Sequence, residues 1–245
     1  MNVTKQRILL TGGTSGIGLA LLKVLYQRGN QLVVVGRDEQ KMQELKQYYP
    51  DVTFLRCNLS SLTDIADLLL TLDRHFSEGF SVLINNAGVQ YTYTLGDEPE
   101  GQSRIISEIQ TNLTSAIMLC DALLPTLTQQ AEAAIINVTS GLGISPKRSA
   151  PVYCATKAGL QVFSKALRYQ LQGSSVQVVD VVLPLVDTPM TAGRGTKKIP
   201  PEQVADELIR GVECGQAVVN VGKVKLFRLI HRLAPSLADL LLKNG

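Results

Sequence analysis

The sequence predicts an α/β fold in which a doubly wound, seven-stranded parallel sheet carries helices on both faces. The first observation is a regular alternation of short apolar runs with longer segments of helical periodicity. The second is that most runs are apolar at successive residues, as in strands that are buried on both faces. No repeat or linker divides the chain, so we expect residues 1–245 to form one domain. The expected strands are residues 8–10, 31–35, 52–55, 82–84, 134–138, 176–182 and 217–221.

Composition excludes several classes of function. The chain has 245 residues with 45% apolar content, which is enough for a large core. Its formal net charge is only +3, so we expect no nucleic-acid partner. The four cysteines lack metal-type spacing; we expect no bound metal and read them as reduced thiols of a cytoplasmic protein. The first residues lack the pattern of a secretory leader, and no apolar run is long enough to span a membrane.

Two helix boundaries carry recognisable signals. Gly29 follows the apolar residues of the first helix and is expected to end it. Ser61 stands three residues before Asp64, which resembles a capping box at the start of the third helix. Both signals fall between expected strands, and they support the alternation of strands and helices.

A glycine-rich turn connects the first strand to the first helix. It has the pattern Gly-x-x-x-Gly-x-Gly over residues 12–18. Glycines in such a turn let the backbone approach a pyrophosphate at the positive end of a helix, as in Rossmann domains. The spacing differs from the more common Gly-x-Gly-x-x-Gly, and an ordinary tight turn is the alternative. The cofactor-binding residues predicted here are Gly12, Thr14, Ser15, Gly16, Ile17 and Gly18.

The end of the second strand indicates which dinucleotide binds. Gly36 stands where an NAD-binding Rossmann protein usually has a carboxylate, and Arg37 offers a guanidinium suited to a 2′-phosphate. We therefore expect NADP(H) as the preferred cofactor, with NAD(H) as the alternative. The neighbouring Asp38 could neutralise Arg37 or contact the ribose. Arg37 could also stack on the adenine or face solvent.

Tyr153 and Lys157 form the most informative pair in the chain. A spacing of four on a helix places the phenol and the ammonium one turn apart. A nearby cation favours the phenolate, so we expect Lys157 to lower the pKa of Tyr153 toward neutral pH. Ser140 lies upstream, at the exit of the fifth expected strand. Each residue alone is common on solvated surfaces, so the prediction depends on their ordered combination.

Five segments together resemble the short-chain dehydrogenase/reductase family. They are residues 11–18, residues 85–88 (Asn-Asn-Ala-Gly), Asn112, Ser140, and Tyr153 with Lys157. The resemblance implies that the chain binds its cofactor along the ends of the strands and that residues 152–171 form a helix at which subunits pair. A homodimer or homotetramer is therefore expected. The further cofactor-binding residues that it implies are Asn58, Leu59, Asn85, Ala87, Gly88, Val186 and Thr188.

The loop after the sixth strand departs from the family pattern. Relatives usually read Pro-Gly-x-Val-x-Thr there, whereas residues 183–188 of this chain read Leu-Pro-Leu-Val-Asp-Thr. Pro184 thus stands at the position of a glycine and is expected to reshape the substrate side of the loop. With the C-terminal helices, this departure is similar to the branch that is related to the oxidoreductase of D-alanylation operons.

The resemblance also implies a reaction, which is hydride transfer between NADP(H) and a carbonyl or alcohol substrate. Tyr153 would act as the general acid or base, and Lys157 would lower the pKa of Tyr153 and hold the nicotinamide ribose. Ser140 would orient the substrate oxygen, and Asn112, in a helix expected over residues 103–124, would hold a water of the proton relay. The alternative is a non-catalytic regulator or scaffold that binds NADP(H), because a fold does not by itself establish catalysis.

The expected substrate cavity is lined by residues 90–96, by residues 141–150 and by a candidate lid, residues 189–201. Its apolar lining would include Tyr91, Tyr93, Leu142, Ile144 and Met190. Basic residues of the lid, namely Arg194, Lys197 and Lys198, would attract an acidic group or merely face solvent.

The C-terminal extension, residues 223–245, has leucines at helical spacing and a break at Pro235. We expect it to pack over the substrate cleft or against a second subunit. Its basic residues leave a membrane-surface role as the less favoured alternative.

Overall fold

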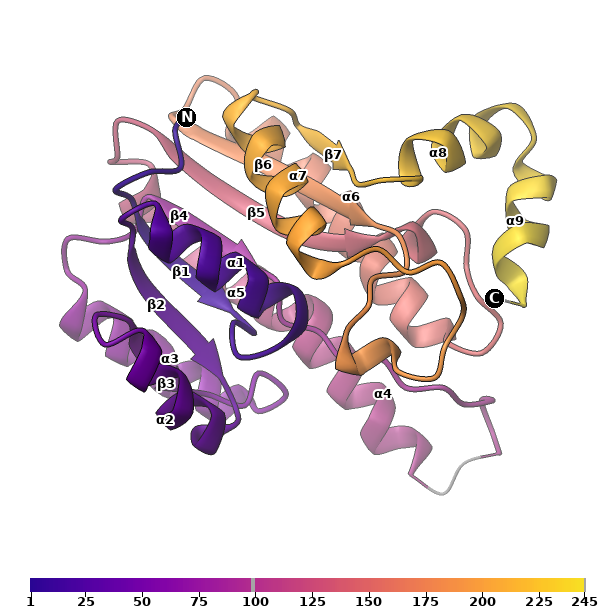
Figure 1. Cartoon of the computed structure of the whole chain (residues 1–245), viewed down its shortest axis with the longest axis horizontal. Coiled ribbons are helices and arrows are strands. Elements are labelled where there is room, and N and C mark those ends of the chain that lie inside the picture. Colours follow the sequence, from indigo (N-terminus) through magenta and orange to yellow (C-terminus); the bar gives the residue numbers. More distant parts are fainter. Residues whose placement is uncertain (98–99, 245) are drawn as a thin grey trace.

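Seven strands form one parallel sheet, and the predicted fold class is confirmed. In this computed structural model, which describes residues 1–97 and 100–244, each expected strand is present with small shifts at its ends. The strands are β1 (Arg7–Thr11), β2 (Gln31–Gly36), β3 (Thr53–Arg56), β4 (Val82–Asn85), β5 (Ala133–Ser140), β6 (Val176–Leu183) and β7 (Val218–Asn220). Their order is β3-β2-β1-β4-β5-β6-β7, and all neighbours are parallel (Figure 1). This is the order of a doubly wound sheet, which places ligands at the carboxyl ends of its strands.

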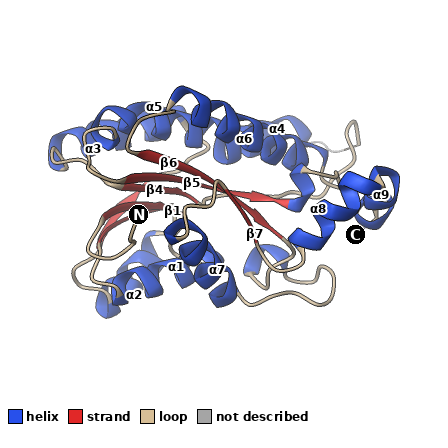
Figure 2. Cartoon of the chain, turned by 90° about the horizontal axis from the view of Figure 1, so that it is seen from above, coloured by secondary structure: helices blue, strands red, loops and turns tan. Residues whose placement is uncertain are grey.

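Helices cover both faces of the sheet (Figure 2). One face carries α1 (Gly16–Gln27), α2 (Glu39–Tyr48) and α7 (Pro201–Glu213). The other carries α3 (Leu62–His75), α4 (Gly101–Ile109), α5 (Ser115–Leu127) and α6 (Pro151–Gln170). The sheet is therefore buried on both sides.

The core has two layers because successive strand residues point to opposite faces. Ile8 and Leu10 of β1 belong to the layer under α1 and α7, whereas Leu9 between them belongs to the layer under α3 and α5. All three side chains are fully buried. This explains why the strands are continuous apolar runs in the sequence and not alternating ones.

Both predicted helix boundaries are present. Gly29 has a φ of +70°, the left-handed conformation that glycine adopts readily, two residues after α1 ends. The Ser61 hydroxyl accepts a hydrogen bond from the Asp64 backbone N–H at 3.2 Å. The capping box is only half formed, because the Asp64 carboxylate accepts instead from the backbone N–H of Asn58 at 3.1 Å. The helix cap thereby holds the loop that carries Asn58.

The helix expected over residues 103–124 is interrupted. Between α4 and α5 lies a π-helical turn, Gln110–Thr114, which the sequence did not predict. Such a turn takes up an additional residue and is frequent at functional sites. Here it contains the buried side chains of Thr111 and Asn112.

The C-terminal segment forms two short helices, α8 (Val224–Leu233) and α9 (Pro235–Lys243), with the predicted break at Pro235. They lie beyond the carboxyl ends of the central strands (Figure 1). Two hydrogen bonds attach α9 to the loop before α6: the Ser145 hydroxyl donates to Asp239, and the Arg148 N–H donates to the Lys243 carbonyl. Within the described part of the chain, no helix has the length and apolar character needed to cross a bilayer.

Candidate active site

A cavity of about 660 Å³ lies along the carboxyl ends of the strands and brings most of the predicted site together. Three predicted residues, Asn85, Asn112 and Lys157, are buried behind its wall and not in it. The predicted residues that line the cavity are Gly12, Thr14, Ser15, Gly16, Ile17, Gly18, Arg37, Asn58, Leu59, Ala87, Gly88, Ser140, Tyr153, Val186 and Thr188.

The glycine-rich turn requires glycine for steric reasons. Gly12 has a φ of +68°, and a Cβ there would lie 2.9 Å from the Cα of Ala87. A Cβ at Gly18 would lie 2.0 Å from the carbonyl oxygen of Gly12. Thr11 holds the facing segment, because its hydroxyl accepts from the Asn86 and Ala87 N–H groups at 3.0 Å. The turn is thus a cradle of backbone at the N-terminus of α1, which suits a phosphate group.

Asp38 does not neutralise Arg37. The Asp38 carboxylate caps α2, where it accepts from the backbone N–H of Lys41 at 3.1 Å and pairs with the Lys41 Nζ at 3.5 Å. These interactions, led by the backbone hydrogen bond, lower the pKa of Asp38. Arg37 forms no ion pair among the described residues and lines the cavity beside Gly36. An exposed guanidinium is therefore available at the end of β2.

Ser140, Tyr153 and Lys157 come together where β5 ends and α6 begins. Lys157 Nζ lies 5.8 Å from the centroid of the Tyr153 ring, as the helical spacing predicts. It donates a hydrogen bond to the Val138 carbonyl at 2.9 Å, and the Lys157 residue is only 3% exposed. The Ser140 hydroxyl accepts from the Leu142 N–H at 3.1 Å, which fixes it at the end of β5. Tyr153 and Ser140 face the cavity, and Lys157 supports them from behind.

The sequence predicted that Lys157 lowers the pKa of Tyr153 toward neutral pH. In the structure, the protein surroundings raise the pKa of Tyr153 and do not lower it. Burial raises the pKa of Tyr153 to about 12, against smaller opposing effects of a hydrogen bond with Ser140 and of the Arg194 charge. Burial also lowers the pKa of Lys157 to about 8, and the charge of Asp180 opposes this shift. Desolvation is the leading cause of both pKa shifts.

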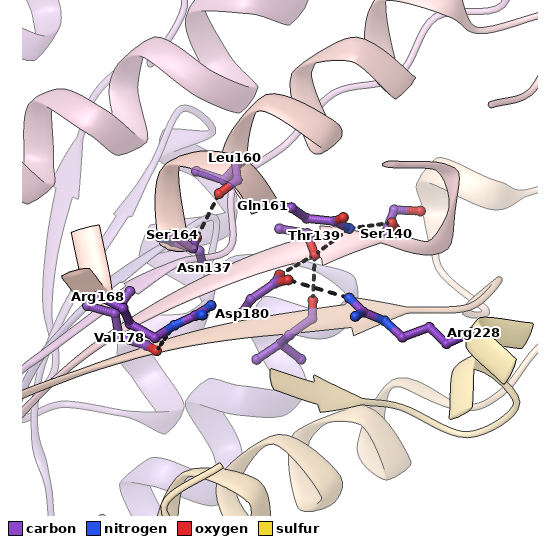
Figure 3. A network of polar contacts seen from close by, with 11 residues as sticks. Asn137, Thr139, Ser140, Leu160, Gln161, Ser164, Arg168, Val178, Asp180 and Arg228 are labelled. Carbon is purple, nitrogen blue, oxygen red and sulfur yellow. Dashed lines mark hydrogen bonds and ion pairs between the residues drawn. The ribbon is translucent and has the colours of Figure 1, made fainter. Parts of the chain in front are cut away.

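A buried polar network that the sequence did not predict lies beneath Ser140 (Figure 3). Asp180 of β6 accepts a hydrogen bond from the Thr139 hydroxyl at 2.5 Å and lies 3.9 Å from the Arg228 guanidinium of α8. The Gln161 amide of α6 donates to the Thr139 hydroxyl at 3.3 Å and to the Ser140 carbonyl at 2.9 Å. Burial raises the pKa of Asp180. The network joins β5 to α6 and to the C-terminal extension.

Asn112 is held by the chain that follows β4. Its side-chain oxygen accepts from the Val89 N–H at 2.8 Å, and its amide donates to the Val89 carbonyl at 2.8 Å and to the Thr156 hydroxyl at 3.2 Å. A Cβ at Gly88 would lie 3.3 Å from the Asn112 oxygen and 3.6 Å from Lys157 Nζ. The π-helical turn thus brings Asn112 close to Lys157.

The Asn85 side chain points into the core and not toward the cavity. Its amide donates to the Asn137 side-chain oxygen at 2.9 Å, and the Asn137 amide donates to the Ser164 hydroxyl at 2.8 Å. Asn85 therefore ties β4 to β5 and α6, while Ala87 and Gly88 of the same motif reach the cavity.

The substrate side of the cavity differs in part from the expected lining. Tyr91, Tyr93 and Ile144 do not line it, whereas Leu142 and Met190 do. Tyr93 is 5% exposed because its hydroxyl donates to the buried carboxylate of Glu108 at 2.8 Å. Gln90 and Lys147 of the expected lining segments and Pro184 of the loop after β6 also line the cavity, as do Lys223, Val224, Phe227 and Leu242 of the C-terminal extension. Leu185 is a lining residue that the sequence did not single out.

The C-terminal extension lies over part of the cavity, in agreement with the expectation that it packs over the substrate cleft or against a second subunit. Val224 and Phe227 of α8 and Leu242 of α9 line the cavity. The opposite face of this helix pair remains uncovered, with Leu226, Leu229 and other leucines exposed. No cluster of three or more potential metal ligands occurs among the described residues.

Comparisons with known proteins agree with this geometry. The family model described as short chain dehydrogenase matches residues 6–199. The uncharacterized oxidoreductase DltE of Bacillus subtilis (strain 168) is 38% identical over 191 residues, which cover 77% of this chain and 74% of DltE. The uncharacterized oxidoreductase SERP2049 of Staphylococcus epidermidis is 30% identical over 231 residues, which cover 92% of this chain and 99% of that protein. The match to DltE agrees with the branch that the sequence predicted.

Solved structures share the fold over nearly the whole chain. A short-chain dehydrogenase from Burkholderia cenocepacia J2315, in complex with NADP, has a TM-score of 0.86 at 22% identity and covers 100% of both chains. A short-chain dehydrogenase from Sphingobium yanoikuyae, in complex with NADPH, has a TM-score of 0.78 at 25% identity and covers 95% of both chains. The likeness extends to residues beyond those that the family model matches.

Proposed function

Because this chain belongs to the short-chain dehydrogenase/reductase family, we propose that it transfers a hydride between NADP(H) and a carbonyl or alcohol substrate. One observation carries the proposal. Ser140 and Tyr153, backed by Lys157, face the same cavity as a glycine cradle at the start of α1. A nucleotide site and a proton-transfer site thus share one cavity.

The residues of the cradle fit a dinucleotide phosphate. The contacts at Gly12 and Gly18 leave no space for a side chain, so a ligand meets backbone there. Arg37, which has no carboxylate partner among the described residues, supports NADP(H) over NAD(H), as do the cofactors named for the two structural neighbours. Asn58, Leu59, Ala87 and Gly88 would border the adenine and the ribose, and Val186 and Thr188 would border the nicotinamide amide.

The chain's own residues would supply the proton and the orientation. When bound, NADPH supplies the hydride. Tyr153 would donate a proton to the carbonyl oxygen in reduction and accept one from the alcohol in oxidation. Ser140 would hydrogen-bond the same oxygen and align it with Tyr153. Lys157 would stabilise the phenolate and contact the ribose hydroxyls, and Asn112 would hold a water that connects Lys157 to solvent.

Two larger elements have roles in this proposal. Residues 189–201 would act as a lid, because the segment returns to Val186 through a bridge with Ile199 and carries Met190 and Arg194 in the cavity wall. The exposed side of α6, which includes Val162 and Tyr169, would pair subunits in a homodimer or homotetramer.

Replacing Tyr153 tests the proposal. Tyr153→Phe keeps the ring and removes the proton donor, so NADPH-dependent reduction of aldehydes and ketones should fall about 10²–10⁴-fold. NADPH binding, followed by the fluorescence of the reduced nicotinamide, should be nearly unchanged. Tyr48→Phe is the control, because Tyr48 is 74% exposed and lies outside the cavity lining.

Two outcomes would contradict the proposal. Wild-type turnover by Tyr153→Phe would show that another group transfers the proton. NADPH binding by the wild-type protein without any turnover across a broad panel of carbonyls and alcohols would favour a non-catalytic regulator.

A further inference from the structure

The charges along the cavity wall are all of one sign. Four basic residues line the cavity, and no Asp or Glu does so among the described residues. Arg37 is the basic residue at the end of β2, on the side of the glycine cradle. The other three are Lys147 in the loop before α6, Arg194 in the lid and Lys223 before α8.

Arg194 lies at the proton-transfer end of the cavity. Its guanidinium donates to the Gln90 side-chain oxygen at 2.7 Å and to the Gln90 carbonyl at 3.5 Å, so Gln90 fixes its position. Gln90 lies two residues after Gly88, where an added Cβ would be 3.6 Å from Lys157 Nζ, so Arg194 is held near the proposed proton-transfer residues. Burial raises the pKa of Tyr153, and the Arg194 charge opposes that rise. The remaining guanidinium N–H groups have no protein acceptor among the described residues.

Two basic residues next to this wall are paired with carboxylates, whereas those of the wall itself are not. Lys198 of the same lid pairs with Asp187 at 3.4 Å, and Arg228 of α8 faces Asp180 at 3.9 Å. Lys147, Arg194 and Lys223 form no ion pair in the part of the chain that the structure describes. A half-buried cation without a protein counter-ion is costly, and an anionic ligand would relieve that cost.

The cavity wall also carries large apolar side chains beside uncharged polar residues such as Thr191 and Thr196. The apolar ones include Leu142, Leu185, Met190, Phe227 and Leu242. A cavity with this lining and a guanidinium held in place suits a molecule with a hydrocarbon body and a planar anionic group.

We propose that the substrate is a carbonyl compound or alcohol that carries a carboxylate, and that Arg194 binds this carboxylate while Tyr153 and Ser140 bind the reacting oxygen. The inference rests on the proposed hydride transfer and adds the substrate class. Arg194 is the primary contact because Gln90 holds it, and Lys147 and Lys223 add positive potential at the same wall.

Aldehyde pairs that differ only in charge test the inference by turnover. Para-carboxybenzaldehyde is compared with its methyl ester, and succinic semialdehyde with its methyl ester, at saturating NADPH. We expect each acid to have a kcat/KM about 10-fold to 100-fold above that of its ester, and Arg194→Gln to remove this advantage with the ester rates retained. Lys197→Gln is the matched control, because Lys197 lies in the same lid outside the cavity lining.

A binding measurement separates this inference from the proposed reaction. The Tyr153→Phe protein with bound NADPH is titrated with para-carboxybenzaldehyde and with its ester, and the fluorescence of NADPH reports the ternary complex. Tighter binding of the acid that Arg194→Gln abolishes supports the inference, even where the wild-type protein reduces neither aldehyde and hydride transfer itself fails.

Three results would overturn it. Equal binding of para-carboxybenzaldehyde and its ester, or no binding of the acid, would show that the wall does not select a carboxylate, whatever the turnover of the esters. Weaker NADPH binding by Arg194→Gln, with the preference for acids intact, would assign the guanidinium to the cofactor.

Discussion

The part of the cavity proposed to bind the cofactor (the cofactor side) and the part proposed to bind the substrate (the substrate side) are built in different ways. The cofactor side comes mostly from residues within the first 88 of the chain, and close backbone contacts such as Gly12 to Ala87 shape it. The substrate side comes from the lid and from α8 and α9, and side chains such as Arg194 and Phe227 shape it. One side therefore depends on the path of the backbone and the other on the choice of side chains.

This difference predicts how each side responds to substitution. A side chain added on the cofactor side meets backbone, which cannot move without disturbing β1 and β4. A side chain changed on the substrate side leaves the backbone in place and alters the shape or charge of the cavity. Substrate preference can thus change while the cofactor and the fold stay the same.

The largest effect is expected at the glycine cradle. Gly12→Ala would place a Cβ 2.9 Å from the Ala87 Cα, so NADPH affinity should fall at least about 100-fold and stability should drop by about 2–4 kcal/mol. Gly173→Ala is the control: Gly173 also has a positive φ, +86°, but no atom lies within 4 Å of its added Cβ. Titration with NADPH and urea denaturation measure the two effects. Equal losses in the two variants would mean that backbone strain alone, and not the cradle, explains the glycine.

The next effect concerns the choice of cofactor. Arg37→Gln removes the unpaired guanidinium, so NADPH should bind about 10-fold to 100-fold more weakly while NADH binding stays the same. Arg56→Gln is the matched control, because Arg56 ends the neighbouring strand opposite Gly36 and does not line the cavity. Competition between the two reduced cofactors gives the ratio directly. A parallel loss of NADH binding would indicate that Arg37 stacks on the adenine.

Lys157 lies where the two sides meet, and its burial should cost stability. Its pKa falls from 10.5 to about 8 in the fold, so Lys157→Met should stabilise the protein by up to about 3 kcal/mol near pH 7, less the lost hydrogen bond to Val138. The folded pKa lies below the unfolded one, so the gain is full below about pH 8 and shrinks as the pH rises to 10.5. Urea denaturation from pH 7 to pH 10.5 measures this gain in stability, and the variant Lys165→Met, at an exposed lysine of the same helix, is the control.

A destabilised Lys157→Met protein at neutral pH would contradict the burial argument. Activity should be lost in the same variant, because the ammonium is then absent from the catalytic set. Stability and activity would thus change in opposite directions at one residue.

The smallest effect is expected on the substrate side. Phe227→Ala should lower kcat/KM for para-carboxybenzaldehyde about 10-fold by enlarging the cavity, with NADPH binding unchanged. Leu226→Ala is the control, because the Leu226 side chain is 61% exposed and lies outside the cavity lining. Steady-state kinetics and NADPH titration separate the two quantities. Loss of NADPH binding in Phe227→Ala would mean that the two sides are not independent.

The positions of the glycine-rich turn and of the Tyr153 and Lys157 pair could be predicted from the sequence because their signals are local. Gly12, Gly16 and Gly18 lie within one turn between a strand and a helix, and Tyr153 and Lys157 lie one helical turn apart. Periodicity and spacing are therefore sufficient to place them. The seven strands were predictable for the same reason, since each is a short apolar run.

The buried network and part of the substrate side could not be predicted, because they depend on contacts between distant segments. Asp180 is the one charged residue in an otherwise mostly apolar strand, and its contacts with Thr139 and Arg228 arise only from the packing of β5, β6 and α8. Tyr93 looked like a lining residue but turns away to bond Glu108. A carboxylate in a buried strand was the only signal that the sequence offered for the network.

The π-helical turn sets the rotational phase between α4 and α5. One extra residue in a helix rotates the residues before it by about 100° relative to the residues after it. The direction in which α4 presents Glu108 to Tyr93 therefore differs from the direction that an uninterrupted helix continuing from α5 would give it. Deletion of one residue between Gln110 and Thr114 would rotate the Glu108 carboxylate away from Tyr93, while α5 would keep its packing on the sheet. An insertion or deletion in this helical turn would therefore alter the surroundings of the proposed active site more than most single substitutions would.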